Sequence, residues 1–139
     1  MKLIDRIKLH EGSMTRHGRH VMYSDSKGIL TIGYGRNLQE RGLSDEEAEY
    51  LLRNDIADAA DDLRRNYPWV IFLSAERQEV LVEMVFNMGI ARFNTFKRMI
   101  DAVKVEDYEA SAREMLDSKW HKDVGKRAET LAMIMLNGK

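Results

Sequence analysis

Cysteine is absent from this chain of 139 residues, and proline occurs only once, at Pro68. The lack of cysteine excludes a disulfide scaffold and thiolate metal sites, and it is typical of a protein made in a reducing compartment. The four histidines lack the spacing of metal ligands, so we expect no metal site. Apolar runs are too short to span a bilayer, which predicts no stable insertion into a membrane.

Charge is almost balanced overall, with a net charge of −1, but it is unevenly distributed along the chain. Residues 1–42 contain eight Lys or Arg against four Asp or Glu, whereas residues 43–67 contain three against eight. We interpret the acidic block as the solvated face of a helix. The basic excess is small and has no interleaved aromatic residues, so we expect no nucleic-acid partner.

Long linkers are also lacking, and we expect no targeting segment. No Ser- or Pro-rich stretch divides the chain, which predicts a single domain over residues 1–139 and a monomer. Charged residues interrupt the first six positions before an apolar signal-peptide core can form. We therefore expect synthesis in the cytoplasm without an export signal.

The N-terminal third of the chain predicts a short helix followed by a β-hairpin. Apolar residues among charged neighbours indicate a helix that ends at Gly12, and the polar residues 13–20 indicate a loop. Two β-prone runs, 21–23 and 29–32, flank a turn in which Gly28 can adopt a positive φ. Residues 36–42 then form a connector.

The rest of the chain has a helical pattern. Ser44 and Glu47 form a capping box at the start of a helix that extends to about Asn66, before Pro68. Further helices are predicted over residues 74–88, 94–103, 107–119 and 125–136, with Met84, Met88, Met99, Met115, Met133 and Met135 filling their core. The predicted fold class is α+β: a small lobe with a hairpin, about 1–55, a long connecting helix, and a mostly helical lobe, about 56–139.

Three side chains in the N-terminal third are candidates for acid/base chemistry. Glu11 follows the last turn of a helix, where the carbonyl dipoles and partial burial would raise the pKa of a carboxyl group. Asp25 lies in the hairpin turn and Thr31 in the returning strand. Two carboxylates in different environments suit the cleavage of a glycosidic bond. Taken singly, each has a simpler interpretation, as a surface Glu, a turn Asp or a strand Thr.

The arrangement of these residues resembles that of the phage-type lysozymes, which are muramidases. The similarity covers most of the chain and consists of five motifs in the family's order. They are His10-Glu11-Gly12; Tyr23-Ser24-Asp25-Ser26 with Gly28, Thr31-Ile32-Gly33 and Gly35; Leu43-Ser44 with Glu47-Ala48; Met84-Val85-Phe86-Asn87-Met88-Gly89; and Ser118-Lys119-Trp120 with Lys126-Arg127-Ala128.

The resemblance implies a lysozyme-like fold and a role for each candidate. Glu11 would be the general acid, Asp25 the base-like carboxylate and Thr31 the hydroxyl that positions a water. Family members of this kind typically invert the anomeric centre. Three features depart from the family pattern: the segment between Glu11 and Asp25 is longer, Arg36 stands where many members have His, and both the connector and the C-terminus are short.

Further candidates have roles only by resemblance. Asn87, Arg127 and Tyr23 would contact substrate, and Arg127 would lie near Glu11. Residue types alone also allow Asn87 to satisfy backbone groups, Arg127 to begin a helix and Tyr23 to support the hairpin. Trp120 is expected in the core rather than under a sugar. The basic residues of the 13–20 segment are expected to be solvated, or else to meet anionic wall polymers.

The resemblance predicts a muramidase that cuts the β-1,4 bond between N-acetylmuramic acid and N-acetylglucosamine in peptidoglycan. No metal or organic cofactor is implied, because both proton transfers use carboxyl groups. Access to the wall would require a holin-like pore or lysis. Two alternatives stay open: a lytic transglycosylase that uses Glu11 alone, and a peptidoglycan-binding protein without catalysis.

Overall fold

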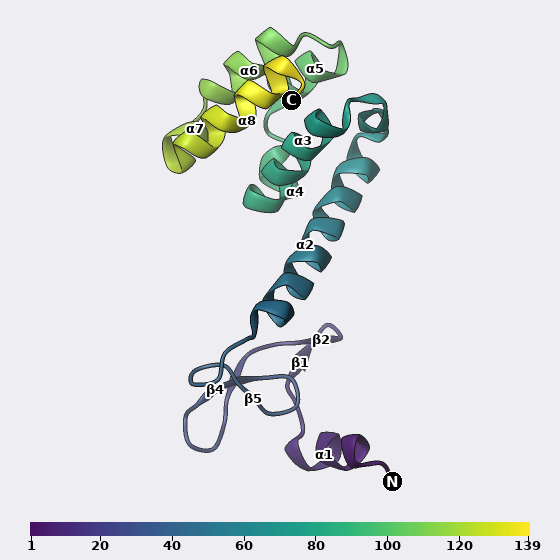
Figure 1. The fold of residues 1–139 in the computed structure, drawn as a ribbon, viewed down its shortest axis with the longest axis vertical. Helices are drawn as coiled ribbons and strands as arrows, with labels where there is room; N and C mark the ends of the chain where they lie inside the picture. The colour runs from purple at the N-terminus through teal and green to yellow at the C-terminus, as the bar shows by residue number, and fades with distance from the viewer. The chain divides into compact units, whose positions relative to one another are not determined.

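The computed structural model describes all 139 residues and confirms the α+β class. The chain divides into two compact units, Met1–Tyr50 and Leu51–Lys139 (Figure 1). The first unit contains a short N-terminal helix, all the strands and the start of a long helix, and the second unit is helical. Helix α2 (Asp45–Asn66) contains the boundary between the two units.

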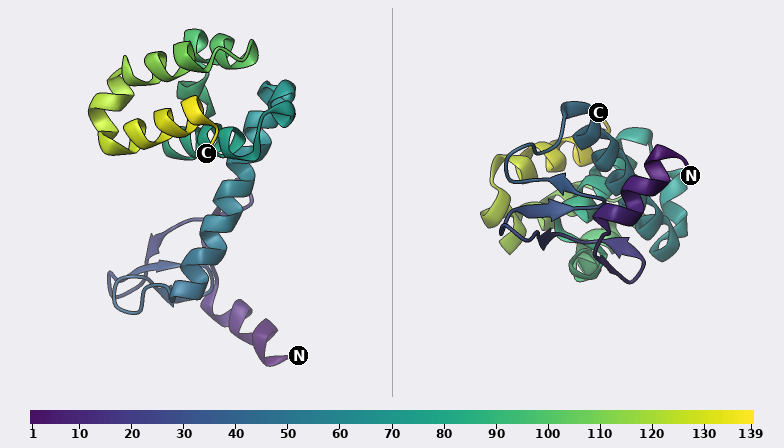
Figure 2. Two further views of the ribbon diagram at one scale, coloured as in Figure 1. Left: turned by 45° about the horizontal axis from the view of Figure 1, so that its top comes forward. Right: turned by 90° about the horizontal axis from the view of Figure 1, so that it is seen from below.

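The first unit combines helix α1 (Leu3–Glu11) with two small antiparallel sheets (Figure 2). One sheet pairs β1 (Thr15–Arg16) with β2 (Arg19–His20). The other has the order β3 (Tyr23–Ser24), β4 (Leu30–Ile32) and β5 (Arg36–Asn37). The predicted hairpin is therefore confirmed, and a third strand extends it.

The segment 13–20 is a second β-hairpin, and our prediction of a loop there was wrong. The turn residues are His17 and Gly18, and both have positive φ, 52° and 76°. A two-residue turn of this kind matches the twist of paired strands. The prediction failed because these strands are polar throughout and lack the alternation that marks a strand.

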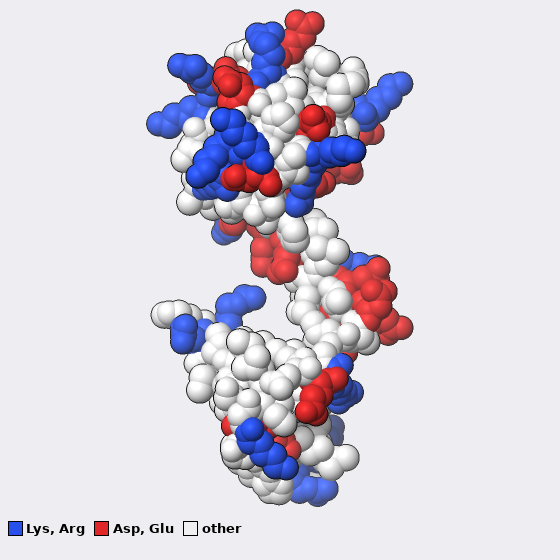
Figure 3. All heavy atoms as spheres, turned by 90° about the vertical axis from the view of Figure 1, so that its left-hand side faces the viewer, with Lys and Arg blue, Asp and Glu red and all other residues white.

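Helix α2 begins as its sequence predicted. The Ser44 hydroxyl accepts a hydrogen bond from the Glu47 amide (3.1 Å), and the Glu47 carboxylate accepts one from the Ser44 amide (2.9 Å). This reciprocal pair is the capping box. Beyond it, acidic side chains gather along the helix, as Figure 3 shows, and nearly all of them are exposed. The interpretation of residues 43–67 as a solvated helix face is thus confirmed for this helix.

The second unit has more helices than the sequence predicted, because several are short. Residues 107–119 were expected to form one helix, but Ser118 caps a new one: its hydroxyl accepts from the His121 amide (3.1 Å) and donates to the Met115 carbonyl (2.7 Å). The elements are η1 (Pro68–Phe72), α3 (Ala75–Met88), α4 (Ile90–Phe93), α5 (Lys97–Lys104), α6 (Tyr108–Leu116), α7 (Lys119–Val124) and α8 (Lys126–Asn137).

The hydrophobic core lies in the second unit, where α8 packs against α6 and α3. Trp120 and Phe93 are buried there, which confirms the core position expected for Trp120. Four of the six methionines predicted in the core are buried, and Met88 is partly buried. Met133 is 56% exposed, so that prediction was wrong for this residue. None of the helices has the length and hydrophobicity needed to span a membrane.

Candidate active site

Glu11 is the last residue of α1, and Gly12 ends the helix with φ 68° while its amide donates to the Lys8 carbonyl (3.1 Å). The positive φ at Gly12, which glycine adopts readily, turns the chain away from the helix immediately after the carboxylate. The side chain of Glu11 is exposed, so the partial burial that we expected is not observed.

Asp25 occupies the turn between β3 and β4, where its side chain organises the backbone. Its Oδ1 accepts hydrogen bonds from the amides of Lys27 (2.8 Å) and Ile29 (2.9 Å). This Asx-type turn fixes the carboxylate in one orientation. Both bonds use the same oxygen, so Oδ2 is left available for another partner.

Thr31 lies in the central strand β4 and is 4% exposed. Its hydroxyl donates to the carbonyl of Ile29 (2.9 Å). Asp25 and Thr31 are therefore brought together at one residue: Asp25 accepts from the Ile29 amide, and Thr31 donates to the Ile29 carbonyl. Because its proton is committed, the Thr31 hydroxyl can only accept a hydrogen bond from a further partner.

Tyr23 is the strand partner of Thr31, and its hydroxyl donates to the Gly33 carbonyl at 3.4 Å. One contact lies within the sheet and the other joins Tyr23 to the residue directly after β4, which agrees with the interpretation of Tyr23 as support for the hairpin. Its predicted contact with substrate stays a prediction.

The loop between β4 and β5 is in direct contact with Glu11, the predicted general acid. Because Ile32 pairs with Arg36, the loop is the three residues Gly33, Tyr34 and Gly35. A Cβ atom placed on Gly35 would lie 3.0 Å from Oε2 of Glu11 and 3.2 Å from its Cδ. The Glu11 carboxylate thus packs on the bare backbone of residue 35. The sequence analysis identified Gly33 and Gly35 only as part of a family motif, and it missed the close approach of Gly35 to Glu11.

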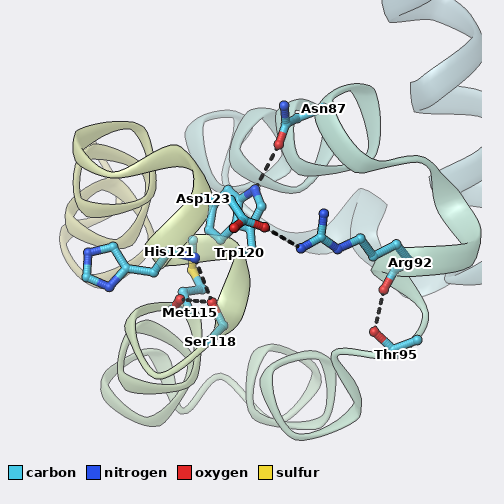
Figure 4. Close-up of polar contacts among 8 residues, drawn as sticks. All are labelled: Asn87, Arg92, Thr95, Met115, Ser118, Trp120, His121 and Asp123. Atoms are coloured by element: carbon cyan, nitrogen blue, oxygen red, sulfur yellow. Dashed lines mark hydrogen bonds and ion pairs between the residues drawn. The ribbon is translucent and has the colours of Figure 1, made fainter.

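Asn87 and Trp120 are linked in the second unit. The Trp120 indole donates from Nε1 to Oδ1 of Asn87 (2.8 Å), and nearby Arg92 pairs with Asp123 (3.1 Å), as Figure 4 shows. Asn87 is itself exposed. Its carbonyl oxygen satisfies a buried indole rather than the backbone, while its amide group is left for an outside partner.

Arg127 pairs with Glu83, with Nε 2.8 Å from Oε2. Both residues line a surface hollow of about 670 Å³ in the second unit, whose walls are largely apolar and include Phe86 and Val82. The proximity of Arg127 to Glu11 that the resemblance implied stays a prediction. No group of three or more His, Cys, Asp or Glu side chains is arranged to hold a metal ion.

Arg36 anchors the connector that leads from the sheet to α2. Its guanidinium donates to the Gly42 carbonyl (3.2 Å) and lies 2.6 Å from Oε2 of Glu47. The hydrogen bond from Arg36, with further bonds from Ser44, lowers the pKa of Glu47 to about 2, and Glu47 in turn raises the pKa of Arg36. The sequence identified Arg36 only as a departure from the family pattern.

Comparison with known proteins places these features in context. The model of the family described as phage lysozyme matches residues 11–133. The central spike protein Gp5 of the pre-baseplate of Enterobacteria phage T4 is 25% identical; the match covers 99% of this chain and 28% of that protein. Probable T4-type lysozymes 1 and 2 of Dictyostelium discoideum are 23% and 22% identical, with 96% and 98% of this chain covered and 93% and 94% of theirs.

A hairpin that carries a carboxylate, a helix that ends in a second carboxylate and a separate helical unit define a lysozyme-like α+β protein. Because the family model matches most of the chain, residues 11–133, the chain belongs to the phage lysozyme family. The chain spans 28% of the length of the T4 spike protein but more than nine-tenths of the two Dictyostelium lysozymes.

Proposed function

We propose that this protein is a muramidase that hydrolyses the β-1,4 bond between N-acetylmuramic acid and N-acetylglucosamine in peptidoglycan, with inversion. Family membership supports a lysozyme-like peptidoglycan hydrolase. The observation that carries the finer proposal is the joint anchoring of Asp25 and Thr31 on Ile29.

Glu11 would act as the general acid. Its carboxyl group would donate a proton to the glycosidic oxygen as the bond to the leaving sugar breaks. Its position supports this role, because the carboxylate is exposed to a substrate and rests against the backbone of Gly35 on one side. Glycine at position 35 gives the acid a defined position without a competing side chain.

Asp25 and Thr31 would activate and orient the attacking water. The water would donate one proton toward Oδ2 of Asp25, because Oδ1 is occupied by two amides. It would donate its other proton to Oγ1 of Thr31, which acts as an acceptor because its own proton goes to Ile29. The lone pair of the water would then face the anomeric carbon, opposite the leaving group. Inversion requires about 6.5–9.5 Å between the two carboxyl groups for this water to fit.

The remaining parts of the proposal concern how the protein works on the wall. It would act as a monomer on glycan strands, using carboxyl groups alone for both proton transfers. After synthesis in the cytoplasm it would reach peptidoglycan through a holin-like pore or on lysis. Asn87, Arg127 and Tyr23 would contact the sugars or their substituents.

The test is clearing of a peptidoglycan suspension by the purified chain, followed by mass spectrometry of the products. A hydrolase gives products with a reducing muramic acid, a transglycosylase gives the anhydro sugar, and a binding protein gives no clearing. We expect Glu11→Gln to fold normally and to lose about 10²–10⁴-fold in rate, because Gln cannot donate a suitably acidic proton.

Asp5→Asn is the matched control for that substitution, because Asp5 is an exposed carboxylate on the same helix. It should clear walls at the wild-type rate. Retention of more than about a tenth of wild-type activity by Glu11→Gln would contradict the assignment of the acid.

A further inference from the structure

The hairpin formed by β1 and β2 is the part of the first unit that the proposed chemistry leaves unexplained. It corresponds to the lengthened segment between the two predicted carboxylates. The Val21 amide donates to the Met14 carbonyl (3.0 Å), so the pairing continues beyond the two strands. The tight turn at His17 and Gly18 gives this segment a defined conformation.

One side chain of this hairpin reaches the loop that contacts Glu11. The His20 ring meets the Tyr34 ring edge to face, with 5.0 Å between centroids and 67° between planes. The Lys8 ammonium lies 5.3 Å from the centroid of the same Tyr34 ring. Contacts of both kinds are attractive, since the face of an aromatic ring is electron-rich.

Tyr34 connects these contacts to the acid. It is the central residue of the loop, between Gly33, whose carbonyl accepts from Tyr23, and Gly35, which touches the Glu11 carboxylate. Glycines on both sides leave this loop backbone little restraint of its own. Pairing of Ile32 with Arg36 closes the loop at its base, and the Tyr34 ring and the Tyr23 hydroxyl provide the side-chain contacts on the loop itself.

We infer that the β1–β2 hairpin braces the Gly33–Gly35 loop through His20, and that His20 is a positioning residue for Glu11. The inference rests on the proposed role of Glu11 as the acid. Movement of the loop would release the carboxylate from Gly35 and misplace it relative to the glycosidic oxygen. Small misplacements of a catalytic group cost rate, whereas substrate binding elsewhere is unaffected.

The experiment compares three variants on a soluble peptidoglycan oligosaccharide and on intact walls. His20→Ala removes the ring, His20→Phe keeps a ring that can pack on Tyr34, and His17→Asn changes the same hairpin at its turn. Asn tolerates the positive φ of position 17, so this control keeps the turn.

On the soluble substrate, His20→Ala should lower kcat about tenfold with KM within about twofold, because the acid is misplaced rather than lost. His20→Phe should restore kcat, and His17→Asn should match the wild type. A kcat of His20→Ala equal to that of the wild type would overturn the inference. A loss of His20→Ala activity that is confined to intact walls would also overturn the inference, because it would mean that the hairpin contributes to contact with the wall and not to the position of Glu11.

A second readout separates this inference from the proposed function. In NMR spectra, His20→Ala should shift the Gly35 amide and the Glu11 carboxyl carbon, while His20→Phe and His17→Asn should leave both near their wild-type positions. These changes in resonance position are expected even if the wild-type protein cleaves nothing. In that case the proposed function would be wrong, but the inference that the hairpin positions the loop would still hold. Unchanged resonances in His20→Ala would overturn the brace regardless of activity.

Discussion

Gly35 is the residue on which the position of the acid depends most directly. Its φ of +88° disfavours any other residue, and Oε2 of Glu11 lies only 3.0 Å from the position that a Cβ would take. The same loop contains Gly33, with φ +64° and no atom within 4 Å of the position that a Cβ would take. The two glycines therefore form a natural pair: both require a left-handed backbone, but only one contacts Glu11.

We predict that Gly35→Ala and Gly33→Ala each cost about 1–2 kcal/mol of stability, because both place a Cβ in the left-handed region. Only Gly35→Ala should also displace Glu11, with a loss of about tenfold or more in kcat. Thermal unfolding and kinetics on a soluble oligosaccharide measure the two effects. Equal losses of activity in both variants would show that strain in the loop, rather than contact with Glu11, controls the rate.

The sequence predicted the local conformation of the candidate residues better than their tertiary contacts, while their roles in catalysis stay predictions. Asp25 could be recognised as a turn residue, since Asp commonly bonds the amides two or more residues on, and the structure has this arrangement. The approach of Gly35 to Glu11 joins a helix end to a sheet loop, and no local pattern encodes such a tertiary contact. The exposure of Glu11 was missed for the same reason.

At the scale of elements, the connector between β5 and α2 is held by the ion pair of Arg36 with Glu47. The lowered pKa of Glu47, about 2, means that the folded protein favours the charged carboxylate more than the unfolded chain does. The contribution of this pair to stability is therefore complete above the ordinary pKa, about 4.5, and is lost as the pH falls toward 2.

We predict that the Glu47 carboxyl titrates near pH 2 in the wild type and at a clearly higher pH in Arg36→Met, still below the ordinary 4.5 because the bonds with Ser44 remain, as followed by NMR of the carboxyl carbon. Arg41→Met is the control, because Arg41 is an exposed arginine of the same connector. It should leave the midpoint unchanged. A wild-type midpoint close to 4.5 would contradict the anchoring role of Arg36.

Elements with strong local signals were predicted well. The capping box and Pro68 marked the two ends of α2, and the helix predicted over residues 74–88 is α3 (Ala75–Met88). Short elements were missed: α4 has four residues, and β1 and β2 have two each. Elements of this length contain too few residues to show a hydrophobic period, so their structure depends on caps, turns and contacts with the rest of the fold.

At the scale of the whole molecule, the proposed chemistry and the hydrophobic core lie in different parts of the sequence. Glu11, Asp25 and Thr31 belong to Met1–Tyr50, whereas the buried apolar side chains all belong to Leu51–Lys139. Conservative substitutions of the three candidate residues should therefore leave the core intact. This separation allows activity to be tested independently of the folding of the helical unit.

The central claim is that Asp25 and Thr31 direct a water onto the anomeric carbon while Glu11 protonates the leaving group. The most direct test is a ¹H NMR time course of the anomeric signals during cleavage of a soluble peptidoglycan oligosaccharide. Inversion is expected, with the α-anomer appearing first. Asp25→Asn should abolish this signal more completely than Thr31→Ala, because the carboxylate activates the water and the hydroxyl orients it. A β-anomer as the first product, or an anhydro sugar, would contradict the mechanism.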